Sequence, residues 1–291
     1  MTWKQLSFHC PQAEAEALSA QLTELGAVAV TLQDDADQPL FEPGPGETPL
    51  WQSVCVTGLF EDGIDSSAIV AAIRTTLGEH LSLAAEETVE DRAWERAWMD
   101  DYHPMQFGQR LWIVPTDYTA PDPQAVNLLL DPGLAFGTGT HPTTALCLRW
   151  LDAHPPQGQT VIDYGCGSGI LGIAALRLGA RHVDAVDIDP QALQATRDNA
   201  ARNGVDENIA TMFPPQLSGK PVDLVLANIL AGPLVELAPA LAAYVKPEGR
   251  IVLSGLLETQ SAQIVHVYEE FFKNINIAQD EEWIRIDAQR Q

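Results

Sequence analysis

Two glycine-rich stretches lie close together near the middle of the chain. The first, FGTGTHPTTALC at residues 136–147, combines glycines with threonine hydroxyls and a histidine, and the second is DYGCGSGILG at residues 163–172. Glycine lets the backbone approach a ligand closely, and a helix N-terminus offers unpaired N–H donors. We therefore expect one ligand to be held from two sides by these stretches.

An acidic pair follows the second stretch. HVDAVDIDP, residues 182–190, predicts a strand that ends in Asp187 and Asp189. An acidic side chain at this point of a parallel sheet can accept hydrogen bonds from the two hydroxyls of a ribose. The pattern indicates a cofactor that contains a nucleoside.

The glycine spacing fits two kinds of nucleoside cofactor. Gly167, Gly169 and Gly172 match G-x-G-x-x-G, and Asp187 lies 20 residues after Gly167, as in dinucleotide sites. The run also reads as D-x-G-x-G-x-G from Asp163, a pattern associated with S-adenosylmethionine. A carboxylate at the strand end suits a sulfonium cation better than a diphosphate, although Asp163 could also serve only to order the loop.

The position of Asn228 favours S-adenosylmethionine over a dinucleotide as the cofactor. PVDLVLANILAGPL, residues 221–234, predicts the fourth strand of a sheet, followed at once by Asn228 and a helix. Asparagine at a strand end is often only a turn former or helix cap. Its carbonyl can also accept from an amine and direct the nitrogen lone pair at a methyl group. The placement resembles the acceptor motif of amino-directed methyltransferases, but the usual Pro-Pro-aromatic continuation is absent.

His141 is a weaker candidate for chemistry. A histidine beside Pro142, at a predicted helix start, is more often an ordered loop residue than a general base, and proline suits the first helical position. The stretch around it is not a Walker loop, because no Gly-Lys-Ser/Thr follows.

The patterns of strands and helices that would position these residues predict two domains. Residues 1–90 alternate period-two and helical patterns in the order βαββαβ, which is typical of a ferredoxin-like α+β domain. From Gln159 the chain repeats strand, turn and helix, as in a Rossmann-like α/β domain with a parallel sheet. Residues 91–103 predict a linker helix that carries Trp94 and Trp98 on one face, so the α/β domain spans 104–291.

Charge and composition narrow the function. The formal net charge of −24 repels phosphate backbones, so nucleic acid is not an expected partner. Residues 1–103 carry a net −15, which indicates either a solubilising surface or a field that attracts a basic macromolecule. No apolar run reaches membrane length, no secretory signal begins the chain, and four scattered cysteines indicate neither disulfides nor a metal site. We expect a cytoplasmic protein.

In combination, GTGTHPTT, DYGCGSG, AVDIDP and ANILAGPL resemble the PrmA family, the class I methyltransferases of ribosomal protein L11. The resemblance covers the whole chain. It implies transfer of methyl groups from S-adenosylmethionine to lysine side chains and the N-terminal amine of that basic ribosomal protein, with the N-terminal domain recognising the substrate. On matching positions it assigns Thr144, Gly165, Asp187 and Asn228 to cofactor binding.

By the same resemblance Asn228 is also the residue nearest the target amine, which makes it the candidate catalytic residue. Three alternatives remain open at this point. They are a nicotinamide oxidoreductase that uses the G-x-G-x-x-G spacing, a binding module that has lost its cofactor, and a nucleic-acid base methyltransferase, which fits Asn228 but not the charge.

Overall fold

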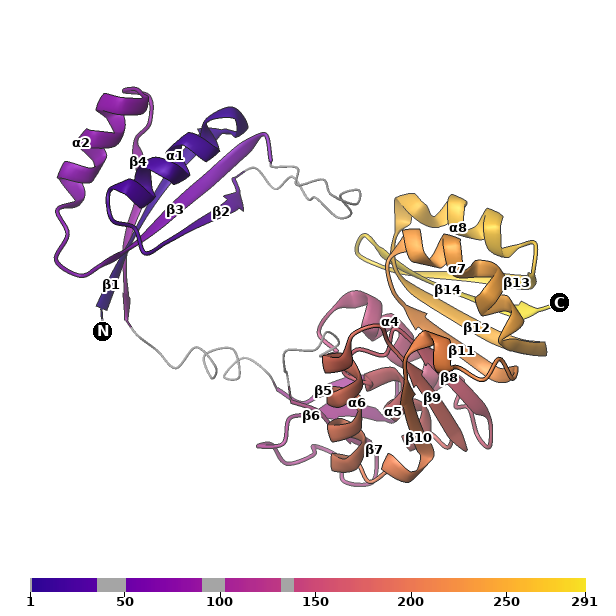
Figure 1. The fold of residues 1–291 in the computed structure, drawn as a ribbon. Helices are drawn as coiled ribbons and strands as arrows, with labels where there is room; N and C mark the ends of the chain where they lie inside the picture. The colour runs from indigo at the N-terminus through magenta and orange to yellow at the C-terminus, as the bar shows by residue number, and fades with distance from the viewer. Residues whose placement is uncertain (1, 36–50, 91–102, 132–138) are drawn as a thin grey trace. The chain divides into compact units, whose positions relative to one another are not determined.

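The computed structural model describes residues 2–35, 51–90, 103–131 and 139–291 (Figure 1). The chain divides into two compact units, residues 1–98 and 99–291. The predicted linker 91–103, with Trp94 and Trp98, lies outside the described residues except for His103. Each unit has its own hydrophobic core.

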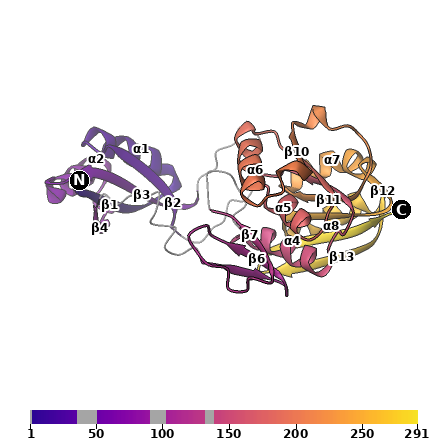
Figure 2. The ribbon, with the colours of Figure 1, turned by 90° about the horizontal axis from the view of Figure 1, so that it is seen from below.

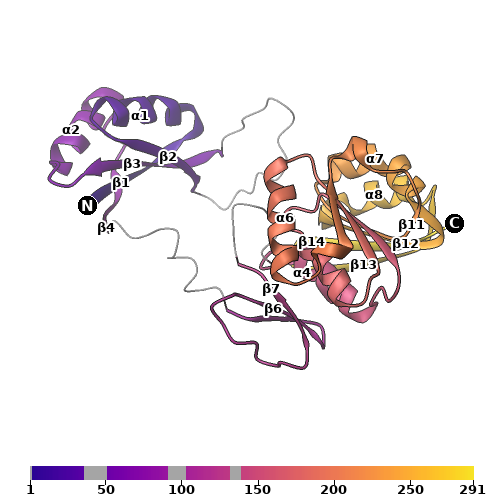
Figure 3. The ribbon, with the colours of Figure 1, turned by 60° about the horizontal axis from the view of Figure 1, so that its bottom comes forward.

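The N-terminal unit is a four-stranded antiparallel sheet with the strand order β2-β3-β1-β4. Both helices lie on one face of this sheet (Figure 3). Its elements are β1 (Thr2–Pro11), α1 (Gln12–Glu24), β2 (Ala29–Asp34), β3 (Ser53–Glu61), α2 (Ser66–Leu77) and β4 (Leu83–Glu90). This arrangement confirms the ferredoxin-like prediction.

Local sequence explains these boundaries. Helix α2 begins at Ser66 because the Asp65 carboxylate caps it, accepting from the backbone N–H of Ala68 at 3.1 Å. Alternate side chains of β1, such as Leu6 and Phe8, are fully buried under the helices. This period-two burial is what the strand pattern predicted.

The second unit contains a seven-stranded sheet of order β10-β9-β8-β11-β12-β14-β13. Its strands are β8 (Thr160–Tyr164), β9 (His182–Val186), β10 (Ile209–Met212), β11 (Val222–Asn228), β12 (Val245–Leu257), β13 (Phe272–Asp280) and β14 (Trp283–Arg290). The first five are parallel to one another. The order reverses direction between β8 and β11, and ligands bind at such a switch point.

Helices cover both faces of this sheet (Figure 1). They are α4 (Pro142–Ala153), α5 (Ile170–Arg177), α6 (Pro190–Arg202), α7 (Ala231–Ala243) and α8 (Ser261–Tyr268). Buried residues of α4, α5 and α6 share one core with the sheet, while those of α7 and α8 share the other. The Rossmann-like prediction is thus confirmed. Among the helices of the described residues, none has the length and hydrophobicity of a membrane span.

The last two strands differ from the expected parallel rhythm. β13 and β14 are joined by only two residues, Glu281 and Glu282, and pair antiparallel, and β14 also runs antiparallel to β12. So short a connection permits only an antiparallel hairpin, because parallel neighbours need a crossover of a dozen or more residues. The hairpin places the last strand of the chain between β12 and the edge strand β13.

A separate three-stranded sheet precedes the helix α4 (Figure 2). It consists of β5 (Met105–Phe107), β6 (Leu111–Val114) and β7 (Val126–Leu129). Asn203, which ends α6, holds β7: its amide donates to the Leu129 carbonyl, and its carbonyl accepts from the Leu129 N–H, both at 2.8 Å.

Asn203→Ala should destabilise this unit, because the half-buried N–H and C=O of Leu129 both lose their partner. We expect a loss of about 1–3 kcal/mol in the free energy of unfolding, measured by urea denaturation. Asn208→Ala, an exposed asparagine with a single bond of 3.3 Å to the Arg181 carbonyl, is the matched control. Equal stability of the two variants would contradict the role given to Asn203.

Candidate functional site

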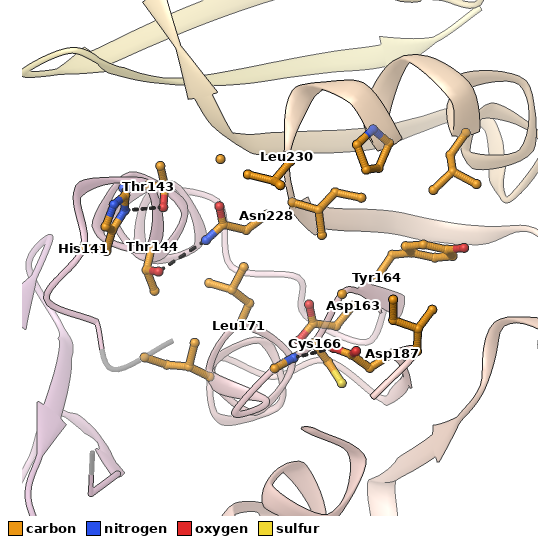
Figure 4. A pocket seen from close by; sticks show the side chains of 18 of the residues that line it. His141, Thr143, Thr144, Asp163, Tyr164, Cys166, Leu171, Asp187, Asn228 and Leu230 are labelled. Atoms are coloured by element: carbon orange, nitrogen blue, oxygen red, sulfur yellow. Dashed lines mark hydrogen bonds between the residues drawn. The ribbon is translucent and has the colours of Figure 1, made fainter. Parts of the chain in front are cut away.

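A cavity of about 850 Å³ opens at the carboxyl ends of the parallel strands (Figure 4). Thr144, Gly165, Asp187 and Asn228, the four residues predicted to bind a cofactor, all line it. They come from α4, from the turn after β8 and from the ends of β9 and β11. Segments that are distant in sequence therefore form one site at the switch point of the sheet.

The glycine turn after β8 leaves no room for side chains. Gly165 has φ +77°, and a Cβ there would overlap the Cγ2 atom of Ile229. Gly255 in β12, at φ +81°, packs against Ile229 from the other side. A Cβ built on Gly255 would lie 2.5 Å from the carbonyl oxygen of Ile229. Both positions require glycine, because left-handed backbone and the packing of Ile229 exclude a side chain. The loop after β11 is thus seated between two glycines.

Asp187 is held by the glycine turn and faces the cavity. Its Oδ2 atom accepts from the N–H of Gly167 at 3.0 Å, and its Oδ1 atom accepts from the N–H of Asp189 at 3.0 Å. Each oxygen keeps a second lone-pair direction for a ligand. The next residue, Ile188, is 82 % exposed and lines the same cavity, so an apolar surface stands beside the carboxylate.

Asp163 is almost completely buried behind this turn. Its Oδ2 atom accepts from the N–H of Gly172, in the first turn of α5, at 2.8 Å. The pKa of Asp163 is raised to about 7, chiefly by burial; the Gly172 N–H opposes the rise, and the neighbouring charge of Asp187 adds to it. The hydrogen bond shows that Asp163 orders the loop, which is one of its two expected roles, and the residue also borders the cavity.

Asn228 is fixed by Thr144 across the cavity wall. The Asn228 Nδ2 atom donates to the Thr144 hydroxyl at 3.2 Å, and Thr144 is buried in the first turn of α4. Figure 4 shows the amide oxygen turned away from Thr144. The half-buried Asn228 therefore keeps its acceptor atom available while its donor is engaged.

His141 caps α4. Its Nδ1 atom lies 3.3 Å from the backbone nitrogen and 2.7 Å from the hydroxyl of Thr143, and its ring meets Trp283 edge-on at 4.7 Å. Burial lowers the pKa of His141, against a smaller opposite effect of Glu282, so the neutral ring that can accept these bonds is favoured. The histidine is an ordered cap, and Pro142 is at the first helical position as expected.

The charges that line the cavity are all of one sign. Asp163, Asp187 and Glu236 contribute carboxyl groups, whereas the described lining residues include no lysine or arginine. Such a cavity favours a cationic ligand over a diphosphate. In the described part of the chain, no group of three or more metal-ligating side chains is present.

Comparison with known proteins places the chain in a family. The model of the family "Ribosomal protein L11 methyltransferase (PrmA)" matches residues 2–291. The chain belongs to this family. Membership in a methyltransferase family favours the methyl-donor interpretation of the glycine turn over the dinucleotide one.

Individual proteins similar to this PrmA-family chain carry the same name as the family. The ribosomal protein L11 methyltransferases of Marinobacter nauticus and Azotobacter vinelandii are 53 % and 52 % identical to it, over all of this chain and 99 % and 100 % of theirs. The crystal structure of a ribosomal protein L11 methylase from Lactobacillus delbrueckii subsp. bulgaricus superimposes with a TM-score of 0.60 at 35 % identity. It covers 65 % of this chain and 100 % of its own.

Several lining residues of this methyltransferase were not singled out from its sequence. Trp283 enters from the C-terminal hairpin, and no local pattern marks it. Pro233, Glu236 and Leu237 lie on one face of α7, and their spacing of three and four residues after a functional loop is a signal that could have identified them.

Asp163 should make stability depend on pH. Its folded pKa of about 7 lies above its ordinary 3.8, so its stabilising contribution is complete below pH 3.8 and is lost as pH rises through 7. Asp163→Asn removes this titration and can keep the acceptor for Gly172. From about pH 5.5 to 8.5, wild type should lose about 2 kcal/mol of unfolding free energy relative to the variant.

Urea denaturation at several pH values measures this difference, and the range stays above the pI of 4.4. Asp206→Asn, at an exposed carboxylate in the short helix before β10, is the control and should show no such trend. A constant difference between wild type and Asp163→Asn across the range would show that Asp163 does not titrate there.

Proposed function

We propose that this protein is a cytoplasmic protein methyltransferase. It transfers methyl groups from S-adenosylmethionine to lysine side chains and the N-terminal amine of ribosomal protein L11. The observation that carries the proposal is Asn228, held by Thr144 with its carbonyl free for an amine, in the same cavity as the glycine turn and Asp187. The names of the family and of the relatives support the substrate.

The residues of the cavity fit S-adenosylmethionine. The backbone of Gly165 lines the cavity, and Asp187 offers carboxylate oxygens to ribose hydroxyls. Ile188 adds an exposed apolar surface for an adenine ring, and the acidic lining suits a sulfonium. Thr144 and Asn228 would lie toward the reacting end. When bound, this cofactor supplies a methyl group already activated by a positively charged sulfur.

The protein's own task is to present a neutral amine. A free lysine has a pKa of about 10.4, so its nitrogen must lose a proton before it can attack. We assign no dedicated base: the largely apolar cavity disfavours the charged amine, water accepts the proton, and Asn228 with nearby backbone carbonyls orients the lone pair. Thr144 keeps the Asn228 amide in one orientation for this purpose.

Transfer of a labelled methyl group tests the proposal directly. The purified protein is incubated with labelled S-adenosylmethionine and a mixture of ribosomal proteins, and products are read by intact and peptide mass spectrometry. We expect mass gains in steps of one methylene, confined to amines of L11. Binding of the cofactor without any transfer to L11 would refute the substrate while leaving the cofactor assignment intact.

Asn228→Ala should lower single-turnover methylation on the order of 100-fold, because an amine misplaced by about 1 Å loses that much reactivity. S-adenosylhomocysteine binding, measured by calorimetry, reports whether the cavity is intact in the variant. Unchanged single-turnover methylation would show that Asn228 does not orient the amine.

The N-terminal unit is proposed to recognise the substrate. We assign residues 1–90 to substrate recognition, 91–103 to a linker and 104–291 to the methyltransferase domain. The net −15 of residues 1–103 complements a basic ribosomal protein, so electrostatic attraction can speed association. A linker between the domains would let one active site reach several amines of the same substrate.

A chain lacking residues 1–90 should bind S-adenosylhomocysteine normally but lose methylation of L11. The separate hydrophobic cores of the two units support independent folding of the remainder, and the binding measurement checks it. Methylation of L11 at the full rate by the truncated chain would remove the recognition role from this unit.

A further inference from the structure

One face of α7 forms the wall of the cavity beside Asn228. Pro233, Glu236 and Leu237 line the cavity from the first two turns of this helix, and Leu230, the residue that caps it, lines the same wall. Their spacing of three and four residues puts these side chains on one side of the helix. Leu230 is 53 % exposed, so an apolar surface is open there.

Glu236 differs from the other carboxyl groups of the cavity. Asp187 accepts a hydrogen bond from the backbone N–H of Gly167 in the glycine-rich loop, and Asp163 accepts one from the N–H of Gly172 in α5. Glu236 is exposed and has no hydrogen bond or ion pair with any other residue that the structure describes. The fold therefore leaves one unpaired carboxylate on a wall that is otherwise apolar.

We propose that this face of α7 receives the target lysine side chain. Glu236 attracts the ammonium group at the mouth of the cavity, and Leu230, Pro233 and Leu237 contact the aliphatic stem. The proposal rests on the proposed function and assigns to it a residue that determines specificity, Glu236, which contacts the substrate before the reaction.

The chemistry of lysine fits this wall. The side chain arrives as an ammonium on four methylene groups, because its pKa is about 10.4. Such a side chain buries its stem along an apolar surface while its charge stays near water and an opposite charge. Deeper in the cavity the amine is neutral and needs a hydrogen-bond acceptor rather than an anion. Asn228 provides this acceptor. An N-terminal amine has no such stem and gains less from this wall.

Steady-state kinetics of Glu236→Gln test the inference. With purified L11 as substrate at low ionic strength, KM for lysine methylation should rise about threefold to fivefold, the range of an exposed ion pair. kcat should not fall, because the pair is made by the ammonium before the amine loses its proton and reacts. The difference in KM should shrink at about 0.5 M salt, where exposed charges are screened. Peptide mass spectrometry separates lysine products from the N-terminal product.

Glu270→Gln is the matched control, because Glu270 is an exposed carboxylate that does not line the cavity. It removes the same charge from the same unit and should leave KM unchanged. Calorimetry with S-adenosylhomocysteine should give equal affinities for wild type and both variants, which shows that the cavity is intact.

The outcomes separate the inference from the proposed function. If wild type methylates L11 and the two variants share one KM at low salt, Glu236 does not receive the lysine and the inference is overturned. A fall in kcat alone would also overturn it, because it would place Glu236 in the chemical step rather than in capture. Absence of methylation by wild type would instead remove the proposed function.

Discussion

The packing of Ile229 between two glycines is the constraint on which the site depends. Its side chain fills the space over Gly165, and its carbonyl lies against Gly255, so any larger residue at either position would push the loop after β11 outward. Asn228 immediately precedes this residue. The same contact therefore brings Asn228 to Thr144 and sets the distance between the glycine turn after β8 and the wall formed by α7.

Electrostatics follow from this arrangement. Three carboxyl groups border the cavity without a lysine or arginine among its described lining, and one of them, Asp163, is almost completely buried. A buried carboxyl whose pKa is raised to about 7 is costly to ionise, and the backbone N–H of Gly172 only partly offsets this cost. The protein thus keeps a site suited to cations, and Asp163 also secures the helix that follows the turn.

Hydrogen bonds, as well as the hydrophobic cores, hold the small three-stranded sheet against α4 and α6. Asn203 joins the small sheet to α6 through both groups of the Leu129 backbone. Asp152, at the end of α4, accepts from the N–H groups of Gln109 and Arg110 in the turn between β5 and β6. These contacts stabilise α4, which carries Thr144 at the cavity, and α6, which begins shortly after Asp187.

The sequence by itself determined the two architectures and that the residues proposed to bind the cofactor lie in one place. The glycine turn, Asp187 and Asn228 each come directly after a predicted strand. Because the carboxyl ends of parallel strands lie at one edge of the sheet, the sequence predicts that these residues lie close together. Only the tertiary structure decided the rest. Trp283 reaches the cavity because a two-residue turn forces an antiparallel hairpin. Glu236 stays unpaired because no lysine or arginine among the described residues forms an ion pair with it. Both depend on contacts between residues distant in the chain, which local patterns do not encode.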